Sequence, residues 1–354
     1  MFRKCLLTVI IIQIACNLLL SQTTGNKGES DFVKRKNAGI AYNKGISDIK
    51  LAKYNEALVA FTEAIANNAT FDLAYLQRGK TRLQLANFKG AEEDFNQAIK
   101  VNNSLGEAYF SLAYCKLVSD TSKATVALFD KAIQNAYTNP EVYYYRGVLK
   151  YFKKDIQGAL NDFSAAIERK PDYKLAYFDR GNARLAMSDF QGAIYDFRQV
   201  IAIDSTTYLA YNNSASAKIQ LGDYPGAIAD LNKLIKQQPK NAVALNNRGS
   251  ARYKAGDLQG AQDDLKASLT LNDKDASTYS NLGNVLSKLN NNNNKGAIEQ
   301  YNKAIQLNSN YTDAYLNRGL VKELSGDLDG ACADWKTALK LGSVSAAKYV
   351  KECK

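Results

Sequence analysis

One 34-residue pattern recurs nine times along this chain, and it limits the possible fold more than any single residue does. Most copies have a glycine at the eighth position, a small residue twelve positions later and a large apolar residue four beyond that. The glycines are Gly79, Gly147, Gly181, Gly249, Gly283 and Gly319. Nine copies, with two extra residues in the eighth, span 308 residues from Ala38 to Ser345. Self-similarity at this period predicts a stacked-repeat solenoid, which holds other molecules along an extended surface.

Each copy contains two segments with apolar residues at helical spacing. In the second copy the first segment carries Tyr75, Leu76, Gly79 and Leu83, and the second carries Phe95, Ala98 and Ile99. A break at residues 86–87 separates them, which predicts a pair of antiparallel helices. The residues at positions 8 and 20 are small because the two helices must cross closely there. The four prolines fall at predicted turns or helix starts, so they interrupt no helix.

This pattern resembles the tetratricopeptide repeat, and the resemblance covers 308 of the 354 residues. It implies an all-α fold: a right-handed α-solenoid of nine tandem helix-turn-helix repeats over residues 38–345, closed by a C-terminal capping helix at residues 343–354. Position 4 is usually Tyr here, where the family often has Trp. The third repeat departs furthest, with Ala113 for the glycine and Thr125 for the small residue. Residues 290–294, all Asn, predict a mobile loop in the eighth repeat.

The N-terminus is typical of an export signal. Arg3 and Lys4 precede an apolar run over residues 6–20, which is shorter than the roughly 20 residues of a membrane-spanning helix. We expect a signal peptide at residues 1–21, cleaved near Ser21, and a polar linker at residues 22–37. An uncleaved anchor and a lipoprotein beginning at Cys16 are the alternatives. The expected location is therefore periplasmic, cell-surface or secreted.

Composition argues against catalysis and against nucleic acid. The chain contains no histidine, the usual general base at neutral pH and the commonest metal ligand. It also has no glycine-rich phosphate loop and no Ser or Cys beside an activating base. We expect no enzymatic activity, no cofactor and no metal. The net charge of +11 could suit nucleic acid, but an export signal directs the chain away from it.

Part of the positive charge has a structural explanation. An arginine at position 7 occurs in five repeats, and in all five an aspartate occupies position 23. The pairs are Arg78/Asp94, Arg146/Asp162, Arg180/Asp196, Arg248/Asp264 and Arg318/Asp334. Where position 8 crosses position 20, positions 7 and 23 lie close together, so these pairs predict ion pairs between the two helices. A basic ladder for anionic ligands is the alternative.

Two cysteines predict a disulfide at the C-terminal end. A turn at Gly342 leaves Cys332 ten residues before it and Cys353 eleven after it, so the two side chains can face each other. In an exported protein this favours a disulfide over two free thiols. Cys115 replaces the small residue found at position 10 in other repeats, and we expect it to be buried.

In the tetratricopeptide family, positions 2, 5, 6, 9, 12 and 13 of the first helix line the concave face. The resemblance implies an aromatic stretch in repeats 3–5, containing Phe110, Tyr114, Tyr144, Tyr151 and Phe178. Asparagines at position 6 are similar to the ladder by which the N-acetylglucosamine transferase grips a peptide main chain; they are Asn43, Asn213, Asn247, Asn281 and Asn317. No three consecutive repeats match the carboxylate clamp that binds chaperone tails, so we exclude that ligand.

These features predict a protein–protein interaction scaffold that binds an extended peptide, or an envelope protein, in its concave groove. Its partners would be proteins or peptides, and association with the cell envelope is compatible with export. The alternative function is a glycan- or lipid-binding envelope protein that uses the aromatic stretch as a stacking platform. In the structural alternative, the aromatic residues pack between helices and bind nothing.

Overall fold

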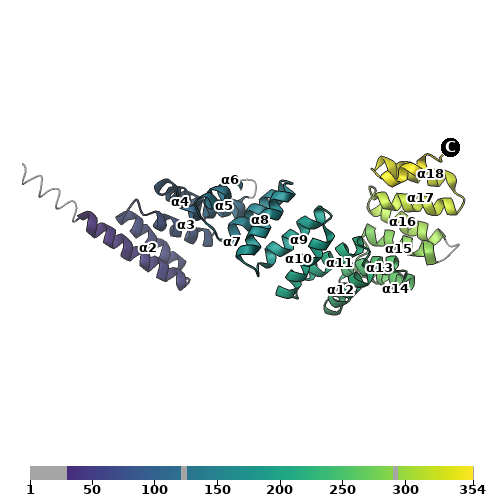
Figure 1. Cartoon of the computed structure of the whole chain (residues 1–354), viewed down its shortest axis with the longest axis horizontal. Helices are drawn as coiled ribbons and strands as arrows, with labels where there is room; N and C mark the ends of the chain where they lie inside the picture. Colours follow the sequence, from purple (N-terminus) through teal and green to yellow (C-terminus); the bar gives the residue numbers. More distant parts are fainter. Residues whose placement is uncertain (1–29, 121–125, 290–293, 354) are drawn as a thin grey trace, which may run out of the picture. The chain divides into compact units, whose positions relative to one another are not determined.

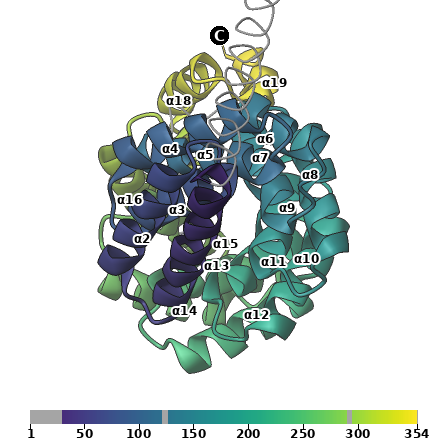
Figure 2. The ribbon, with the colours of Figure 1, turned by 90° about the vertical axis from the view of Figure 1, so that its left-hand side faces the viewer.

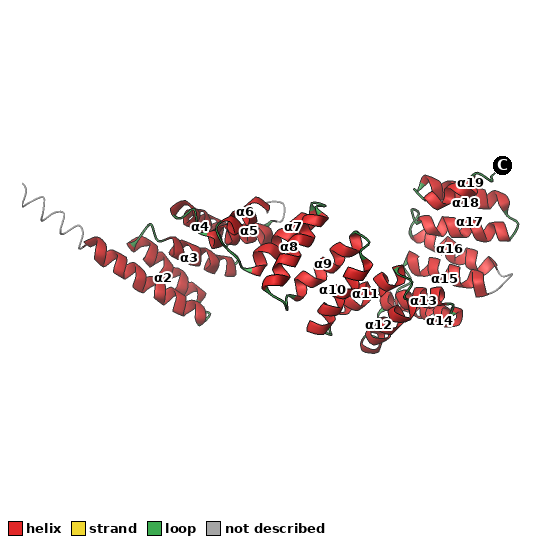
Figure 3. Ribbon diagram, viewed as in Figure 1, coloured by secondary structure: helices red, strands yellow, loops and turns green. Residues whose placement is uncertain are grey.

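The computed structural model describes residues 30–120, 126–289 and 294–353, and every regular element in those ranges is a helix (Figure 3). The chain divides into two compact units, Met1–Arg169 and Lys170–Lys354, so the boundary falls at the end of the second helix of repeat 4. We call them the N-terminal and C-terminal units. The predicted signal peptide, most of the Asn run and Thr125 lie outside the described residues. No helix in the described ranges is long and apolar enough to cross a membrane.

Each repeat of the N-terminal unit is a helical hairpin (Figure 1). The pairs are residues 30–50 with α2 (Tyr54–Asn67), α3 (Asp72–Gln84) with α4 (Phe88–Val101), α5 (Gly106–Ser119) with α6 (Val126–Gln134), and α7 (Pro140–Phe152) with α8 (Ile156–Arg169). Residues 30–37, assigned above to a linker, are the first turns of a helix. No glycine or proline lies between Ser30 and Ala38 to end the helix before repeat 1.

The C-terminal unit continues the same hairpins through repeats 5–9. They are α9 (Lys174–Ala186) with α10 (Phe190–Ile203), α11 (Tyr208–Gln220) with α12 (Tyr224–Gln237), α13 (Ala242–Ala255) with α14 (Leu258–Leu271), α15 (Ala276–Leu289) with α16 (Asn294–Leu307), and α17 (Thr312–Leu324) with α18 (Leu328–Lys340). Within each unit, the second helix of a repeat also packs on the first helix of the next. The core is therefore continuous through each unit.

The close helix crossing predicted at position 8 is present. A Cβ atom added to Gly79 would lie 2.6 Å from the Phe95 ring, and one added to Gly249 would lie 2.8 Å from the Leu265 side chain. Both distances are shorter than van der Waals contact permits. Facing them, the position-20 alanines Ala91 and Ala261 are fully buried. Any larger residue at position 8 would separate the two helices or displace the large side chain at position 24.

All five predicted Arg–Asp pairs form between the helices of a hairpin. Their closest N–O distances are 2.7 Å for Arg78–Asp94, 2.5 Å for Arg146–Asp162, 2.7 Å for Arg180–Asp196, 2.6 Å for Arg248–Asp264 and 2.6 Å for Arg318–Asp334. Each arginine donates from both Nε and Nη2, which is the bidentate geometry of strong pairs. The cations thus serve structural pairs, as the ion-pair interpretation predicts.

A second cation, at position 11, contacts the same buried aspartate. The pairs are Arg82–Asp94, Lys150–Asp162, Arg184–Asp196, Arg252–Asp264 and Lys322–Asp334, at 2.8–2.9 Å. Each carboxylate therefore lies between two cations, and we call each such group a triad. Burial raises the pKa of the fully buried Asp196, while Arg180 and Arg184 oppose that effect. Repeat 6 has no position-7 arginine, and there Lys218 and Ser214 contact Asp230.

Another recurring contact lies at the N-terminus of the second helix of a repeat. An aspartate or asparagine at position 16 accepts a hydrogen bond from the backbone N–H of the glycine three residues later. Asp257, for example, accepts from Gly260 at 2.9 Å. The same contact occurs at Asn87, Asp155, Asp189, Asp223 and Asp327. This is a helix N-cap, which satisfies a backbone donor that the helix itself leaves free. The Asp-x-x-Gly spacing is visible in the sequence.

The capping segment is shorter than the single helix expected over residues 343–354. It consists of a 3-10 turn, η2 (Val344–Ala346), and one helical turn, α19 (Ala347–Val350), which lies beside α18 at the yellow end of Figure 2. The chain then turns at residues 351–352 and brings Cys353 back onto α18. Tyr349 stacks on Trp335 with ring centroids 5.0 Å apart, which covers the last apolar face.

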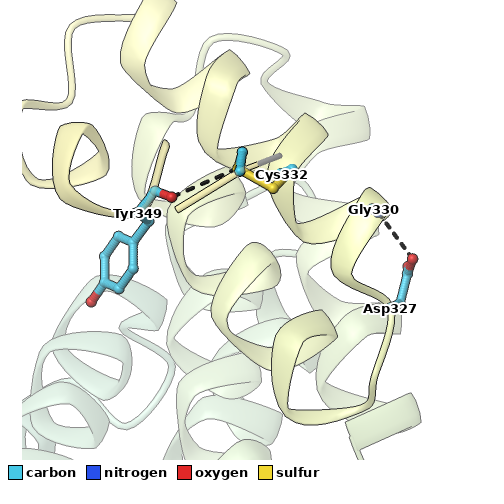
Figure 4. Close-up of a disulfide and its surroundings, with 5 residues drawn as sticks. Asp327, Gly330, Cys332 and Tyr349 are labelled. Atoms are coloured by element: carbon cyan, nitrogen blue, oxygen red, sulfur yellow. Dashed lines mark hydrogen bonds between the residues drawn. A yellow bond between two sulfur atoms is a disulfide. The ribbon is translucent and has the colours of Figure 1, made fainter. Parts of the chain in front are cut away.

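Cys332 and Cys353 are joined in the structure, with Cα atoms 5.7 Å apart (Figure 4). This separation is within the range that a disulfide requires. The bond links α18 to the residues just after α19, so it fixes the capping segment at both ends. Cys115, in contrast, is a buried free thiol that is 1% exposed. Burial raises the pKa of this thiol, which suits its predicted role as a small core residue.

The triads predict a large difference between two adjacent aspartates. Replacing Asp264 by Ala should lower the free energy of unfolding by roughly 3 kcal/mol, because Arg248 and Arg252 then lose their shared counter-ion. Asp263→Ala is the matched control: Asp263 is exposed, and its loss should change stability by less than about 0.5 kcal/mol. Urea unfolding, with hydrogen exchange over α13 and α14, measures both. Equal effects of the two substitutions would contradict the triad's role.

Trp335 provides a test of the disulfide, because it is the chain's one tryptophan and is 3% exposed beneath Tyr349. Replacing Cys332 and Cys353 together by Ser should lower the unfolding free energy of the last repeat by about 3 kcal/mol in the chain-entropy model. The midpoint of the tryptophan fluorescence transition in urea reports this change. Dithiothreitol should produce the same shift in the native chain and none in the variant. A midpoint that reductant leaves unchanged in the native chain would exclude the bond.

Candidate functional site

Four of the five predicted asparagines form one row in the C-terminal unit. They lie on the first helices of repeats 6–9, and each donates a hydrogen bond from Nδ2 to the Oδ1 atom of an asparagine in the preceding repeat. The bonds are Asn213 to Asn182 (2.9 Å), Asn247 to Asn212 (3.3 Å), Asn281 to Asn246 (3.0 Å) and Asn317 to Asn284 (3.0 Å). We call these four donors the asparagine row. Asn43, the fifth, is exposed on the first described helix of the N-terminal unit.

Further hydrogen bonds fix the acceptors of the asparagine row. Asn246 donates to the Ser277 hydroxyl at 3.3 Å, and the Tyr301 hydroxyl donates to Asn284 at 2.8 Å. Asn246 is 8% exposed, whereas Asn247 and Asn281 in the row are only partly buried. The acceptors Asn212 and Asn246 therefore lie deeper than the row residues that donate to them. These links hold neighbouring repeats together and set the orientation of each row amide before any ligand binds.

Two of the four predicted aromatic residues in the N-terminal unit belong to the core. Phe110 and Tyr144 are each 8% exposed, and Phe110 packs against Tyr114, Phe129, Tyr137 and Tyr145 with ring centroids 5.1–6.4 Å apart. For these two residues the structure agrees with packing between helices. A stacking platform needs exposed ring faces, and their faces are occupied by other rings.

Tyr145, which the sequence interpretation did not single out, lies at the centre of this cluster. Its ring centroid is 5.1 Å from that of Tyr114 and 5.1 Å from that of Tyr144. Burial raises the pKa of Tyr145 to about 12, with further contributions from Tyr114 and Glu141. Burial and then Glu107 raise the pKa of Tyr137 to about 12 as well. Position 6 holds Asn in repeats 6–9 but Tyr145 in repeat 4, and this difference in the sequence could have identified Tyr145.

The remaining aromatic residues divide between the two units. In the N-terminal unit, Tyr151 is partly buried beside Phe152, whose side chain is 72% exposed. In the C-terminal unit, Phe178 packs edge-on against Phe197 with ring centroids 5.8 Å apart. Of the predicted aromatic site residues, Tyr114, Tyr151 and Phe178 therefore retain part of their surface.

Family models match much of the repeat array. Models described as tetratricopeptide repeats match residues 73–105 and 146–206, and a further TPR repeat model matches residues 215–256 and 289–326. A search of curated proteins found no match. The matched ranges fall on the repeats described above.

Solved structures with tetratricopeptide folds also resemble the chain. In the crystal structure of the APC/C hetero-tetramer Cut9–Hcn1, a chain of 15% identity gives a TM-score of 0.53, covering 94% of this chain and 88% of that one. Yeast Tom70 is 12% identical with a TM-score of 0.48, over 90% and 89% of the two chains. MamA is 28% identical with a TM-score of 0.39, over 47% and 96%. With its helical hairpins, close glycine crossings and matching family models, the chain is a tetratricopeptide repeat protein.

Proposed function

We propose that this protein is a non-enzymatic scaffold that holds an extended peptide segment of a partner along the first helices of its repeats. The asparagine row of the C-terminal unit would bind the peptide main chain. One observation carries the proposal: the row amides are already oriented by hydrogen bonds between repeats. Binding groups of the protein that are already in position lose less conformational entropy when a ligand binds. A preformed row therefore favours affinity.

The chemistry of the row suits a peptide main chain. An asparagine amide has two N–H donors and an oxygen with two lone pairs, and the hydrogen bond to the preceding repeat uses one donor. Each row amide can therefore still donate once and accept twice. Main-chain amides present the complementary acceptor and donor on every residue. Binding of this kind depends little on the peptide's sequence.

The surroundings of the row also favour an uncharged ligand. Ser216 and Ser250, at position 9 of repeats 6 and 7, are exposed or half-buried beside it on the same helices. The arginines of repeats 7 and 9 are engaged instead with buried aspartates.

Tetratricopeptide repeats form protein–protein interaction scaffolds, and the family models that match this chain are repeat models.

We further propose that the protein acts outside the cytoplasm, on a secreted or envelope protein. The support is the signal-peptide pattern at residues 1–21 and the pairing of Cys332 with Cys353. Disulfides persist in oxidising compartments and are rare in the cytosol. A cleaved chain would begin near residue 22, which Edman degradation of the native protein would establish.

Removing two row amides should weaken peptide binding. Extended peptides selected from a displayed random library provide the probe, with affinity measured by fluorescence anisotropy. Asn247→Ala combined with Asn281→Ala should raise Kd about tenfold, since the two lost main-chain contacts together contribute about 1.4 kcal/mol. Asn232→Ala with Asn302→Ala is the matched control. Those amides are exposed on second helices, and each also takes part in one hydrogen bond, from Arg248 or Arg318.

The same control separates binding from stability, because both double variants lose two hydrogen bonds. Equal affinities of the row variant and the control would refute the row as the binding surface. A second measurement uses a photo-crosslinking amino acid at Ser216, beside the row, or at Asn232. Adducts with the bound peptide should form from position 216 and not from position 232.

A further inference from the structure

The N-terminal unit contains a pocket on the inner-face positions that the family pattern identifies. It has a volume of about 380 Å³. Its lining comes from the end of the first described helix, the start of α2, and the helices α3 and α5, which Figure 1 shows in dark blue. Gln77, Lys80, Leu83 and Gln84 are positions 6, 9, 12 and 13 of repeat 2. The volume is at the lower end of the range for ligand pockets, so it suits one large side chain.

The lining combines an apolar interior with a polar edge. Phe110 is 8% exposed, and Tyr114, Leu83 and Ile49 are partly buried beside it. Phe110 and Tyr114 stack with ring centroids 6.2 Å apart, and Phe110 also packs on Phe129 and Tyr137. These contacts hold the aromatic wall in place. The amides of Gln77 and Gln84 provide hydrogen-bonding groups around it.

The electrostatics of the pocket disfavour a charged ligand. Lys80 is the one charged residue that lines it, and its Nζ atom pairs with the carboxylate of Glu107 on α5. The pair is internally neutral, and each side chain is 35% exposed. A buried ligand charge would therefore lack an opposite charge to compensate for its lost hydration.

We infer that this pocket binds one large apolar side chain, such as Leu, Phe or Trp, of the extended peptide, with the Gln77 and Gln84 amides contacting the adjacent main chain. This inference rests on the proposed function and adds the chemical class of the residue that is recognised. The equivalent position 6 is Gln77 in repeat 2 and Ser111 in repeat 3, but Asn in the row of the C-terminal unit. The N-terminal unit thus offers a pocket for a side chain, whereas the asparagine row of the C-terminal unit offers groups for main-chain contacts.

A peptide series tests the inference on the full chain. The probes are fluorescently labelled Gly-Ser peptides of nine residues with a central Leu, Trp, Lys or Glu. The Leu and Trp peptides should bind at least tenfold more tightly than the Lys and Glu peptides. Gln77→Trp should fill the pocket and weaken the Leu peptide at least tenfold. Gln97→Trp, on the exposed face of α4, makes the same substitution outside the pocket and should leave affinity unchanged.

A second variant provides a readout that does not depend on filling the pocket. Lys80→Gln leaves Glu107 without its partner, so the pocket edge becomes negative. The difference in affinity between the Lys and Glu peptides should then shift at least threefold in favour of the Lys peptide. An unshifted difference would contradict the electrostatic argument. Circular dichroism confirms that each variant is folded.

The outcomes separate this inference from the proposed function. Equal binding of all four peptides would overturn the pocket while leaving main-chain binding by the asparagine row intact. Failure of the Leu peptide to bind, or unchanged binding by Gln77→Trp, would also overturn it. Leu-peptide binding that is weakened by Gln77→Trp but unaffected by Asn247→Ala with Asn281→Ala would support the pocket as a separate site, while the library-selected peptides test the row.

Discussion

The contact between a glycine at position 8 and a large side chain at position 24 determines the geometry of every hairpin in which it occurs. The Phe95 ring lies so close to Gly79 that no side chain fits between them. This approach brings the neighbouring positions 7 and 23 within hydrogen-bonding distance, which is why an arginine and an aspartate pair there. The close crossing also leaves the aspartate almost without water, so it needs strong partners. Apolar packing and ion pairing in this fold are therefore two results of one steric constraint.

The triads account for much of the basic composition. Two cations and one carboxylate leave each triad with a net charge of +1, and five triads give +5 of the chain's +11. Their arginines are mostly buried; Arg180, for example, is 11% exposed. Nearly half of the surplus is thus held inside hairpins. The basic isoelectric point arises in part from the cations that join the two helices of a hairpin. It is therefore weak evidence for an anionic ligand.

Features that repeat within 34 residues could be predicted from the sequence, because each partner occurs at a fixed spacing. The helix pairs and the Arg–Asp contacts are of this kind. The approach of Cys332 to Cys353 occurs once, and it could be predicted because a single turn separates the two residues. Contacts between repeats were harder to predict. The family pattern identifies the face on which Asn247 and Tyr114 lie, but depth on that face depends on the residues of the adjoining repeat. Thus Asn247 bonds to Asn212 of the preceding repeat, and Tyr114 packs against Tyr145 of the following repeat.

The location of each triad also affects how such an array can change in length during evolution. Arg248, Arg252 and Asp264 all belong to one 34-residue segment, so duplicating that segment in the gene copies a complete set of charges. Deleting it removes the complete set. A repeat can therefore be gained or lost without leaving an unpaired charge in the core. Hydrogen bonds that join different repeats, such as Asn281 to Asn246, lack this property, because a new junction can separate the partners. Because each triad lies within one repeat, the ion pairs allow the number of repeats to change. The asparagine hydrogen bonds join different repeats, so they constrain the order of the repeats.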